Sequence, residues 1–237
     1  MRTIGLVGGM SWESTAVYYR LLNEAVRARL GGLASAEIAM RSVDFARIVA
    51  LQTSGRWDLA ADALAAAARG LERAGADCIL ICTNTMHLVA DEVAAAVGVP
   101  LIHIVDETAA AIRAEGGRRP LLLATRYTME HGFYAARMAR HGLDVVVPDA
   151  DDRQAIHAII FDELCRGVVT PASRDRALAI VERGRAAGAD SVILGCTEIC
   201  LLLDPAALPL PGFDSTAIHT DAALRFALGE ETAAAAA

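Results

Sequence analysis

The stretch AGADCILICTNT (residues 74–85) recurs without a gap as AGADSVILGCTE (residues 187–198), nearly half of the 237-residue chain further on. Two weaker pairs accompany it: RTIGLVGGMS (2–11) matches RPLLLATRYT (119–128), and PLIHIVDETA (100–109) matches PLPGFDSTA (209–217). Self-similarity at a fixed spacing is typical of duplicated structural units. The sequence therefore predicts two similar lobes, one formed by residues 1–98 plus 211–237 and the other by residues 99–210.

Each lobe combines short apolar runs with longer periodic segments. The runs are continuous rather than alternating, which is typical of parallel strands covered on both faces; they lie at residues 4–7, 79–82, 121–124, 145–147 and 192–194. Alanine-rich segments, many preceded by Ser, Thr or Asp and followed by Gly, predict helices at residues 14–30, 58–74, 86–97, 106–115, 153–166, 172–187 and 215–228. The predicted fold class is α/β: two pseudo-symmetric lobes, each a mostly parallel sheet flanked by helices, with the active site in the cleft between them.

The composition excludes several kinds of chemistry and partner. All 22 basic residues are arginines, so a PLP Schiff base and a Walker A loop, which both need lysine, are excluded. A net charge of −7 with scattered arginines gives no electrostatic surface for nucleic acid or an anionic membrane, so we expect a small-molecule ligand. No leader precedes the first strand, no apolar run reaches about 18 residues, and the five cysteines are an odd number. These features predict a cytoplasmic protein with free thiols.

The residues that close the apolar runs are the candidate site, because ligands of open α/β sheets bind at the carboxyl ends of strands. The internal repeat places Thr83 of one lobe at the position of Cys196 in the other, so both would face one small ligand. Cys196 also precedes a helical stretch at residues 197–203, whose N–H groups and dipole are expected to lower the thiol pKa from about 8.5. The alternative is an inert buried cysteine.

Neither the cysteine spacing nor the glycine-rich turn predicts a bound metal or nucleotide. Cys78 and Cys82 lie on one predicted strand, where four residues span about 13 Å, too far for both to ligate one zinc ion. The turn GLVGGMS (5–11) lacks the G-x-G-x-x-G pattern, so its glycines are expected to let a small ligand approach the backbone.

Five stretches, in order along almost the whole chain, carry a family resemblance: GGMSWEST (8–15), SVDF (42–45), CTNTMH (82–87), LLATRYTM (122–129) and GCTEI (195–199). On these the chain resembles the aspartate/glutamate racemases, amino-acid racemases that use no cofactor. The resemblance implies an enzyme in which one cysteine from each lobe flanks the α-carbon of the substrate. One cysteine removes the α-proton and the other returns a proton from the opposite side.

The chain departs from this family pattern at the first cysteine. Most relatives have a cysteine immediately before Asn-Thr, whereas here Thr83 holds that position and Cys82 comes one residue earlier. Successive strand side chains point to opposite faces, so we expect Cys82 in the core and Thr83 at the cleft. The chain thus resembles a branch with a Thr/Cys pair, which implies a preference for L-aspartate and L-glutamate with Cys196 as the base. A rival interpretation, in which Cys82 serves instead, stays open.

Eight candidate substrate-binding residues close strands or begin helices: Met10, Ser11, Asn84, Thr85, Thr125, Thr128, Thr197 and Glu198. Two more, Arg47 and Gln52, follow the SVDF stretch. Helix N-termini suit the α-carboxylate, although simple helix capping is an alternative role for the Asn and Thr residues. Arg47, with Gln52 nearby, is the candidate for the side-chain carboxylate. Many relatives carry a lysine where this chain has Cys165, so the partner of that carboxylate is left open. His87 and His219 are expected to be structural.

Two other functions fit the sequence. A related enzyme with one effective cysteine could decarboxylate or isomerise dicarboxylic acids by protonating a single face. A protein that only binds acidic amino acids would be stabilised by them without exchanging the α-proton. The choice between aspartate and glutamate, and the formation of a homodimer, are also left open.

Overall fold

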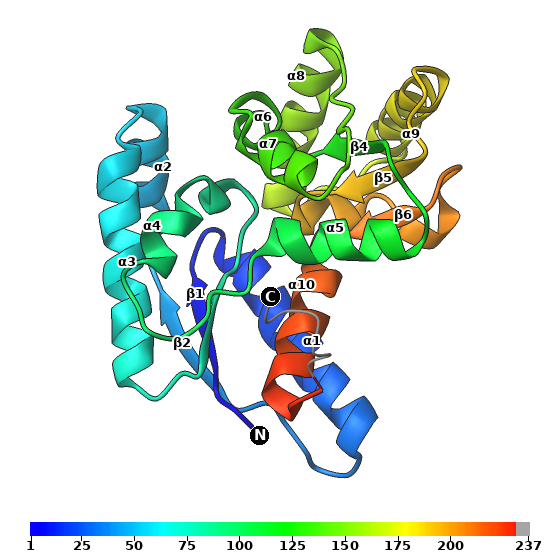
Figure 1. The fold of residues 1–237 in the computed structure, drawn as a ribbon. Helices are drawn as coiled ribbons and strands as arrows, with labels where there is room; N and C mark the ends of the chain where they lie inside the picture. Colours follow the sequence, from blue (N-terminus) through cyan, green and yellow to red (C-terminus); the bar gives the residue numbers. More distant parts are fainter. Residues whose placement is uncertain (231–237) are drawn as a thin grey trace. The chain divides into compact units, whose positions relative to one another are not determined.

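In a computed structural model that describes residues 1–230, the chain divides into two units (Figure 1). The first unit contains residues 1–103 and 219–230, and the second contains residues 104–218. Both divisions fall a few residues after the boundaries predicted from the sequence, and residues 231–237 of the predicted first lobe lie outside the described residues. Each unit contains a parallel three-stranded sheet flanked by helices, which confirms the α/β class.

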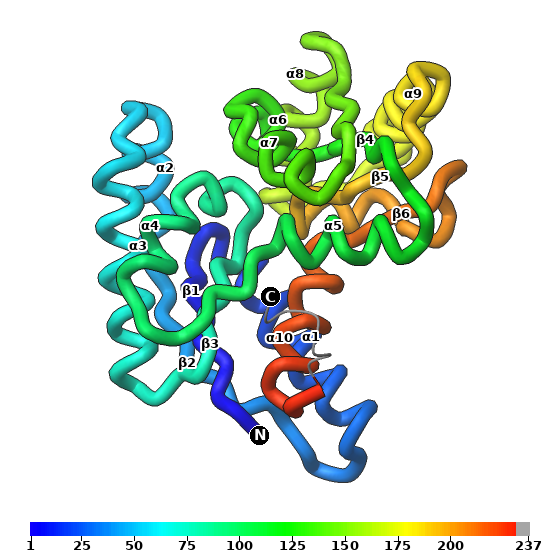
Figure 2. The backbone as a smooth tube through the Cα atoms, viewed as in Figure 1, coloured from blue at the N-terminus to red at the C-terminus, as the bar shows by residue number. Residues whose placement is uncertain are grey.

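Each sheet has three strands, labelled in Figure 2 except where they overlap, and one parallel bridge beside them. In the first unit, β1 (Ile4–Gly8) lies between β2 (Ile38–Ser42) and β3 (Cys78–Ile81), and a parallel bridge joins β3 to Leu101. In the second, β5 (Ser191–Leu194) lies between β4 (Pro120–Leu123) and β6 (Gly212–Asp214), and a parallel bridge joins β4 to Val146. The repeat equates β1 with β4, β3 with β5 and the Leu101 segment with β6. The order of the strands therefore agrees with a duplicated unit.

Helices cover both faces of the first sheet, which explains why its strands are apolar throughout. Ile4, Leu6 and Leu80 pack with residues of α1 (Trp12–Leu30) and of α10 (Ser215–Leu228). Val7 and Ile81 face the other way and pack with α2 (Phe45–Thr53), α3 (Trp57–Arg73), the 3-10 turn η1 (Thr85–Val89) and α4 (Ala90–Ala94). Each fully buried aliphatic side chain contributes about 1.5–3 kcal/mol to this packing.

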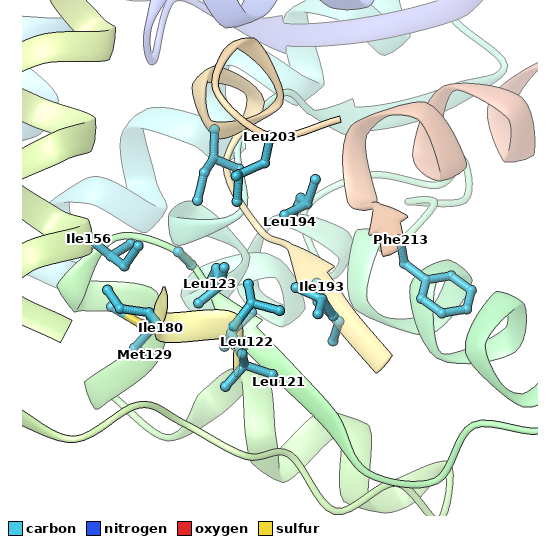
Figure 3. Packing of buried hydrophobic residues seen from close by; sticks show 14 of the residues in the cluster. Leu121, Leu122, Leu123, Met129, Ile156, Ile180, Ile193, Leu194, Leu203 and Phe213 are labelled. Carbon is cyan, nitrogen blue, oxygen red and sulfur yellow. The ribbon is translucent and has the colours of Figure 1, made fainter. Parts of the chain in front are cut away.

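One large apolar cluster forms the core of the second unit. Figure 3 shows part of it, with the leucines of β4 and Ile193 and Leu194 of β5 among residues from the surrounding helices. The helices that flank this sheet are α5 (Ile104–Ala114), α6 (Arg126–Glu130), α7 (Phe133–Arg140), α8 (Ala150–Ala158) and α9 (Pro171–Ala186). Gly184 lets α9 approach β4 closely, since a Cβ atom there would come within 2.6 Å of the Leu121 side chain.

Several predicted elements differ in the structure. The run at residues 145–147 forms only the single bridge at Val146. The predicted helix at 153–166 ends as α8 at Ala158 and continues as a π turn, η2 (Ile159–Glu163), and a 3-10 turn, η3 (Leu164–Arg166). Six short elements of the described residues have no predicted counterpart: β2, β6, α2, α6, α7 and the 3-10 turn η5 (Pro205–Ala207).

Two further observations concern the described residues only. Between residues 1 and 230 there is no helix with the length and apolar character needed to cross a membrane. The same residues contain no group of three or more His, Cys, Asp or Glu side chains arranged to hold a metal ion.

Candidate active site

Equivalent strand ends carry the two candidate catalytic residues. In the first unit the Cys82 N–H donates to the Val7 carbonyl oxygen at 3.0 Å, and Thr83 follows it. In the second unit the Gly195 N–H donates to the Leu123 carbonyl oxygen at 2.8 Å, and Cys196 follows it. Each candidate therefore begins the loop that leaves its sheet at the carboxyl end of a strand, where ligands of such folds bind.

Thr83 and Cys82 differ sharply in their surroundings. Cys82 is fully buried in the apolar cluster that includes Leu6 and Leu80, and this burial raises the pKa of its thiol far above the ordinary value. Thr83 is only partly buried, and its carbonyl oxygen lies 2.8 Å from Nδ1 of His87. The burial of Cys82 favours Thr83 over Cys82 as the residue available to a ligand.

Cys196 shares a hydrogen-bond acceptor with its neighbour. The Cys196 thiol donates to Oε2 of Glu198 at 2.9 Å, and the Thr197 hydroxyl donates to the same oxygen at 2.7 Å. Burial of the thiol, and next the Glu198 carboxylate, raise the pKa of Cys196 well above its ordinary value. The prediction that a helix start lowers this pKa is wrong, because only the five-residue 3-10 turn η4 (Thr197–Leu201) follows Cys196 and its dipole is outweighed.

This geometry gives Cys196 a neighbouring proton acceptor. A thiol must lose its proton before it can act as a base, and the carboxylate oxygen of Glu198 is already within hydrogen-bond distance of that proton. The sequence predicts Glu198 as a substrate-binding residue, and its contact with the Cys196 thiol is an additional finding of the structure. The spacing C-x-E was the available signal, because a short turn can bring side chains two residues apart together.

The candidate substrate-binding residues of the first unit differ in what is available to a ligand. Met10 is buried in the core cluster with Val7 and Met86. The Ser11 hydroxyl caps α1 by accepting from the Ser14 N–H at 3.2 Å. Both side chains thus have a clear structural role.

The other candidates of this unit lie on α2 and at η1. Arg47 is exposed and has no ion pair with another residue in the range 1–230. Gln52 is buried, and its Nε2 donates to the sulfur of Met86 at 3.0 Å. Asn84 and Thr85 are buried at the start of η1, and the Asn84 side chain makes no capping hydrogen bond to that turn. Simple capping therefore does not account for Asn84.

In the second unit, Thr125 and Thr128 follow β4, with their hydroxyl oxygens 3.2 Å apart. Thr128 is almost completely buried, while Thr125 is partly buried at the start of α6. Cys165 lies in the 3-10 turn η3, which contacts η4. None of the five cysteines of the chain is in a disulfide bond.

The glycines after β1 serve the packing of the chain itself. A Cβ atom at Gly8 would come within 2.4 Å of the Thr15 side chain. Gly9 has a φ of +89°, and a Cβ atom there would come within 2.2 Å of the Val43 carbonyl oxygen. Packing alone therefore requires glycine at both positions, and the approach of a ligand to this backbone stays a prediction.

The chain is similar to known proteins in sequence and in fold. A sequence model of the family described as Asp/Glu/Hydantoin racemase matches residues 7–223. The crystal structure of a candidate Asp/Glu racemase from Yersinia pestis is 50% identical, with a TM-score of 0.91 over 96% of this chain and 100% of that chain. The structure of an aspartate racemase homologue from Pyrococcus horikoshii OT3 is 34% identical, with a TM-score of 0.86 over the same shares of the two chains.

A curated relative matches over a shorter stretch. The broad specificity amino-acid racemase RacX of Bacillus subtilis (strain 168) is 27% identical over 150 residues. The match covers 62% of this chain and 63% of RacX, which is less than two thirds of that protein's length.

Proposed function

The chain belongs to the Asp/Glu/hydantoin racemase family, and from this premise we propose that it is an isomerase that interconverts the enantiomers of aspartate or glutamate without a cofactor. The observation that carries the proposal is the equivalence of the two strand ends that hold Thr83 and Cys196. Racemisation needs a proton-transferring group on each face of the α-carbon. A duplicated fold supplies one such group from each of its units.

The proposed reaction begins at Cys196. Oε2 of Glu198 takes the thiol proton, and the thiolate then removes the α-proton of the L-enantiomer, leaving a planar carbanion. Thr83 relays a proton from water to the opposite face, so that the D-enantiomer forms. The proton held by Glu198 then passes to solvent and neutralises the hydroxide that is left, while Cys196 is again a thiol. A threonine hydroxyl ionises far above neutral pH, so Thr83 is a poor base, and removal of the α-proton from the D-enantiomer is correspondingly slow. Because enantiomers have equal free energies, kcat/KM for interconversion is the same in both directions, so this preference for the L-enantiomer concerns α-proton exchange and leaves the equilibrium unchanged.

The preference for acidic substrates is supported by Arg47. Its guanidinium is exposed and has no ion pair within the described part of the chain, so it is available for a two-point contact with a carboxylate. The resemblance implies a lysine at the position of Cys165, which this chain lacks, and the RacX match comes from a broad specificity enzyme. A test of substrate range must therefore include neutral and basic amino acids.

Proton NMR in heavy water tests the proposal directly. Both enantiomers of aspartate and glutamate, with alanine and lysine for comparison, are incubated with the protein, and the loss of the α-proton signal is followed. We expect deuterium at the α-carbon of L-aspartate or L-glutamate, and a loss of about 10²–10⁴-fold in the Cys196→Ser variant. Thermal stabilisation by these amino acids without any exchange would instead identify a binding protein, and loss of carbon dioxide from a malonate-type substrate would identify a decarboxylase.

A further inference from the structure

Three histidines and a tyrosine form a buried cluster in the first unit, next to the turn that contains Thr83. The exposed fractions of Tyr18, His87, His103 and His219 are 0%, 3%, 6% and 0%. The ring centroid of His87 lies 4.7 Å from that of His103 and 5.6 Å from that of His219, and the rings of His219 and Tyr18 are 5.7 Å apart. We call these four residues the histidine cluster.

The hydrogen bonds of His219 define its neutral tautomer. Nε2 lies 2.8 Å from the Ile102 carbonyl oxygen, which can only accept, so Nε2 carries the hydrogen. Nδ1 lies 2.9 Å from the Tyr18 hydroxyl, which can donate to it. Both ring nitrogens are thus satisfied without a positive charge. Burial, with His103 as the only titratable neighbour that opposes a charge, lowers the pKa of His219 to about 4.

His87 must have the opposite tautomer when it is neutral. Its Nδ1 lies 2.8 Å from the Thr83 carbonyl oxygen, so Nδ1 carries the hydrogen and donates it. This bond closes the turn between the end of β3 and η1. The rings of His103 and His219 pack edge-to-face against the His87 ring, at interplanar angles of 65° and 70°, and so restrict its orientation.

We propose that His87 is a positioning residue for Thr83: its Nδ1–H fixes the Thr83 carbonyl and thereby the direction of the Thr83 side chain, while His103 and His219 hold the His87 ring in place. The proposal rests on the proposed function, since Thr83 has a catalytic role only in such a racemase. His103 and His219 also stand at the two points where the chain crosses between the units, 103–104 and 218–219. The two residues that hold the His87 ring, and through it the Thr83 turn, therefore lie at these two crossings.

The tautomers provide a test that is independent of catalysis. Long-range proton–nitrogen NMR of protein with isotope-labelled histidine distinguishes the two neutral tautomers and the charged ring. Signals are assigned with the single variants His87→Asn and His219→Gln. Near neutral pH we expect the Nδ1–H form for His87 and the Nε2–H form for His219. An Nε2–H form for His87 would overturn the proposal, whether or not the protein is a racemase.

Two variants then separate the donor from the ring. His87→Asn keeps an N–H donor near the position of Nδ1, whereas His87→Phe keeps a ring and removes the donor. We expect kcat for conversion of the L- to the D-enantiomer, which needs Thr83, to fall about 10- to 100-fold in His87→Phe with KM nearly unchanged, since small displacements of a catalytic group cost up to about 10²-fold. His87→Asn should stay within about threefold of the wild type. Thermal melting confirms that each variant is folded.

The controls distinguish failure of this inference from failure of the proposed function. His131→Phe, at an exposed histidine of the second unit, should leave kcat unchanged. Equal losses in His87→Phe and His87→Asn, or full activity in His87→Phe, would overturn the positioning role. Full activity in Thr83→Ala would instead remove Thr83 from the proposed mechanism and leave the tautomer result standing.

Discussion

At the scale of single residues, the contact between Cys196 and Glu198 sets the chemistry of the second unit. One carboxylate oxygen accepts from the thiol and from the Thr197 hydroxyl, and it stabilises the thiol against ionisation. The same oxygen is the nearest group that could take the proton when a thiolate is needed. In the proposed mechanism Glu198 therefore has two opposing effects, since it raises the pKa of Cys196 at rest and accepts its proton during the reaction.

Replacement of Glu198 by glutamine separates these two effects. In Glu198→Gln the negative charge is gone, so the pKa of Cys196 should fall and alkylation of its thiol at mildly alkaline pH should become faster. Exchange of the L-substrate should nevertheless fall about 10²-fold, because the proton acceptor is lost. Thr197→Val is the matched control, since it removes the other donor to the same oxygen and leaves the charge. An unchanged alkylation rate in Glu198→Gln would contradict this account.

Thr83→Cys tests the asymmetry between the two proposed catalytic residues. A thiol is a far better base near neutral pH than a hydroxyl, so this variant should exchange the α-proton of the D-enantiomer at least about tenfold faster than the wild type. Cys82→Ala is the control for the rival interpretation and should leave exchange of both enantiomers unchanged, because Cys82 is buried in the core. The rates are measured by NMR in heavy water. Unaltered D-side exchange in Thr83→Cys would refute the proposed pairing.

The residues of the candidate site were only partly predictable from the sequence. The repeat was sufficient to place Thr83 and Cys196 at equivalent strand ends, since it aligns the two strands without a gap. The acidity of Cys196 was not, because it depends on burial and on a carboxylate brought close by a 3-10 turn. The histidine cluster joins residues that are far apart in the sequence, and no local pattern predicts contacts of that kind.

At the scale of elements, local patterns predicted the strands that are buried on both faces and missed those that are not. β2 has the sequence IAMRS and is half-buried or exposed along its length, and β6 has three residues, so neither has a continuous apolar run. The periodicity at residues 153–166 gave no sign of a change from α8 to the π turn η2, which depends on how this segment packs. Patterns therefore indicate burial more directly than they indicate where an element ends.

His219 is buried among α1, α10 and the segment around Ile102, and its burial predicts that the folded protein loses stability in acid. The pKa of His219 is about 4 in the folded state, where the ring is neutral, and 6.5 is the ordinary value expected in the unfolded chain. Between pH 4 and pH 6.5 the unfolded chain therefore binds the proton more readily than the folded protein. The neutral His219 ring contributes its full stabilisation above about pH 6.5, and this stabilisation is lost as the pH falls toward 4. The neighbouring titratable groups are Tyr18, His87 and His103, none of which supplies a negative charge to offset the proton.

His219→Gln removes this titration. Between about pH 7.5 and pH 5 the wild type should lose on the order of 2 kcal/mol more unfolding free energy than His219→Gln, as measured by urea denaturation at each pH. The variant starts from a lower stability at neutral pH because its bond with Tyr18 is altered. His131→Gln, at an exposed position, should follow the wild type. Parallel pH profiles for the wild type and His219→Gln would contradict the assignment of a buried neutral imidazole.

At the scale of the whole molecule, the chain builds its second unit from one continuous segment and its first unit from two. The second unit has its own sheet and its own large apolar cluster. Near its C-terminal end the Ser215 hydroxyl donates to the Leu194 carbonyl oxygen of the same unit at 2.9 Å. The first unit needs residues on α10 to cover one face of its sheet. Separation of the two units should therefore affect them unequally.

A chain of residues 104–218 should fold alone, with helical circular dichroism and a cooperative urea transition of at least about 5 kcal/mol, since domains of this size reach such values. A chain of residues 1–103 should unfold at a lower urea concentration than the chain of residues 104–218. It lacks the part of α10 that includes Ala223 and Ala227, so the side chains of Ile4, Leu6 and Leu80 become exposed to water. Neither segment should exchange the α-proton of L-aspartate or L-glutamate, because Thr83 and Cys196 are then on different chains. Exchange by residues 104–218 alone, at a rate near that of the full chain, would show that Cys196 and Glu198 act without the other unit and would remove the two-sided mechanism.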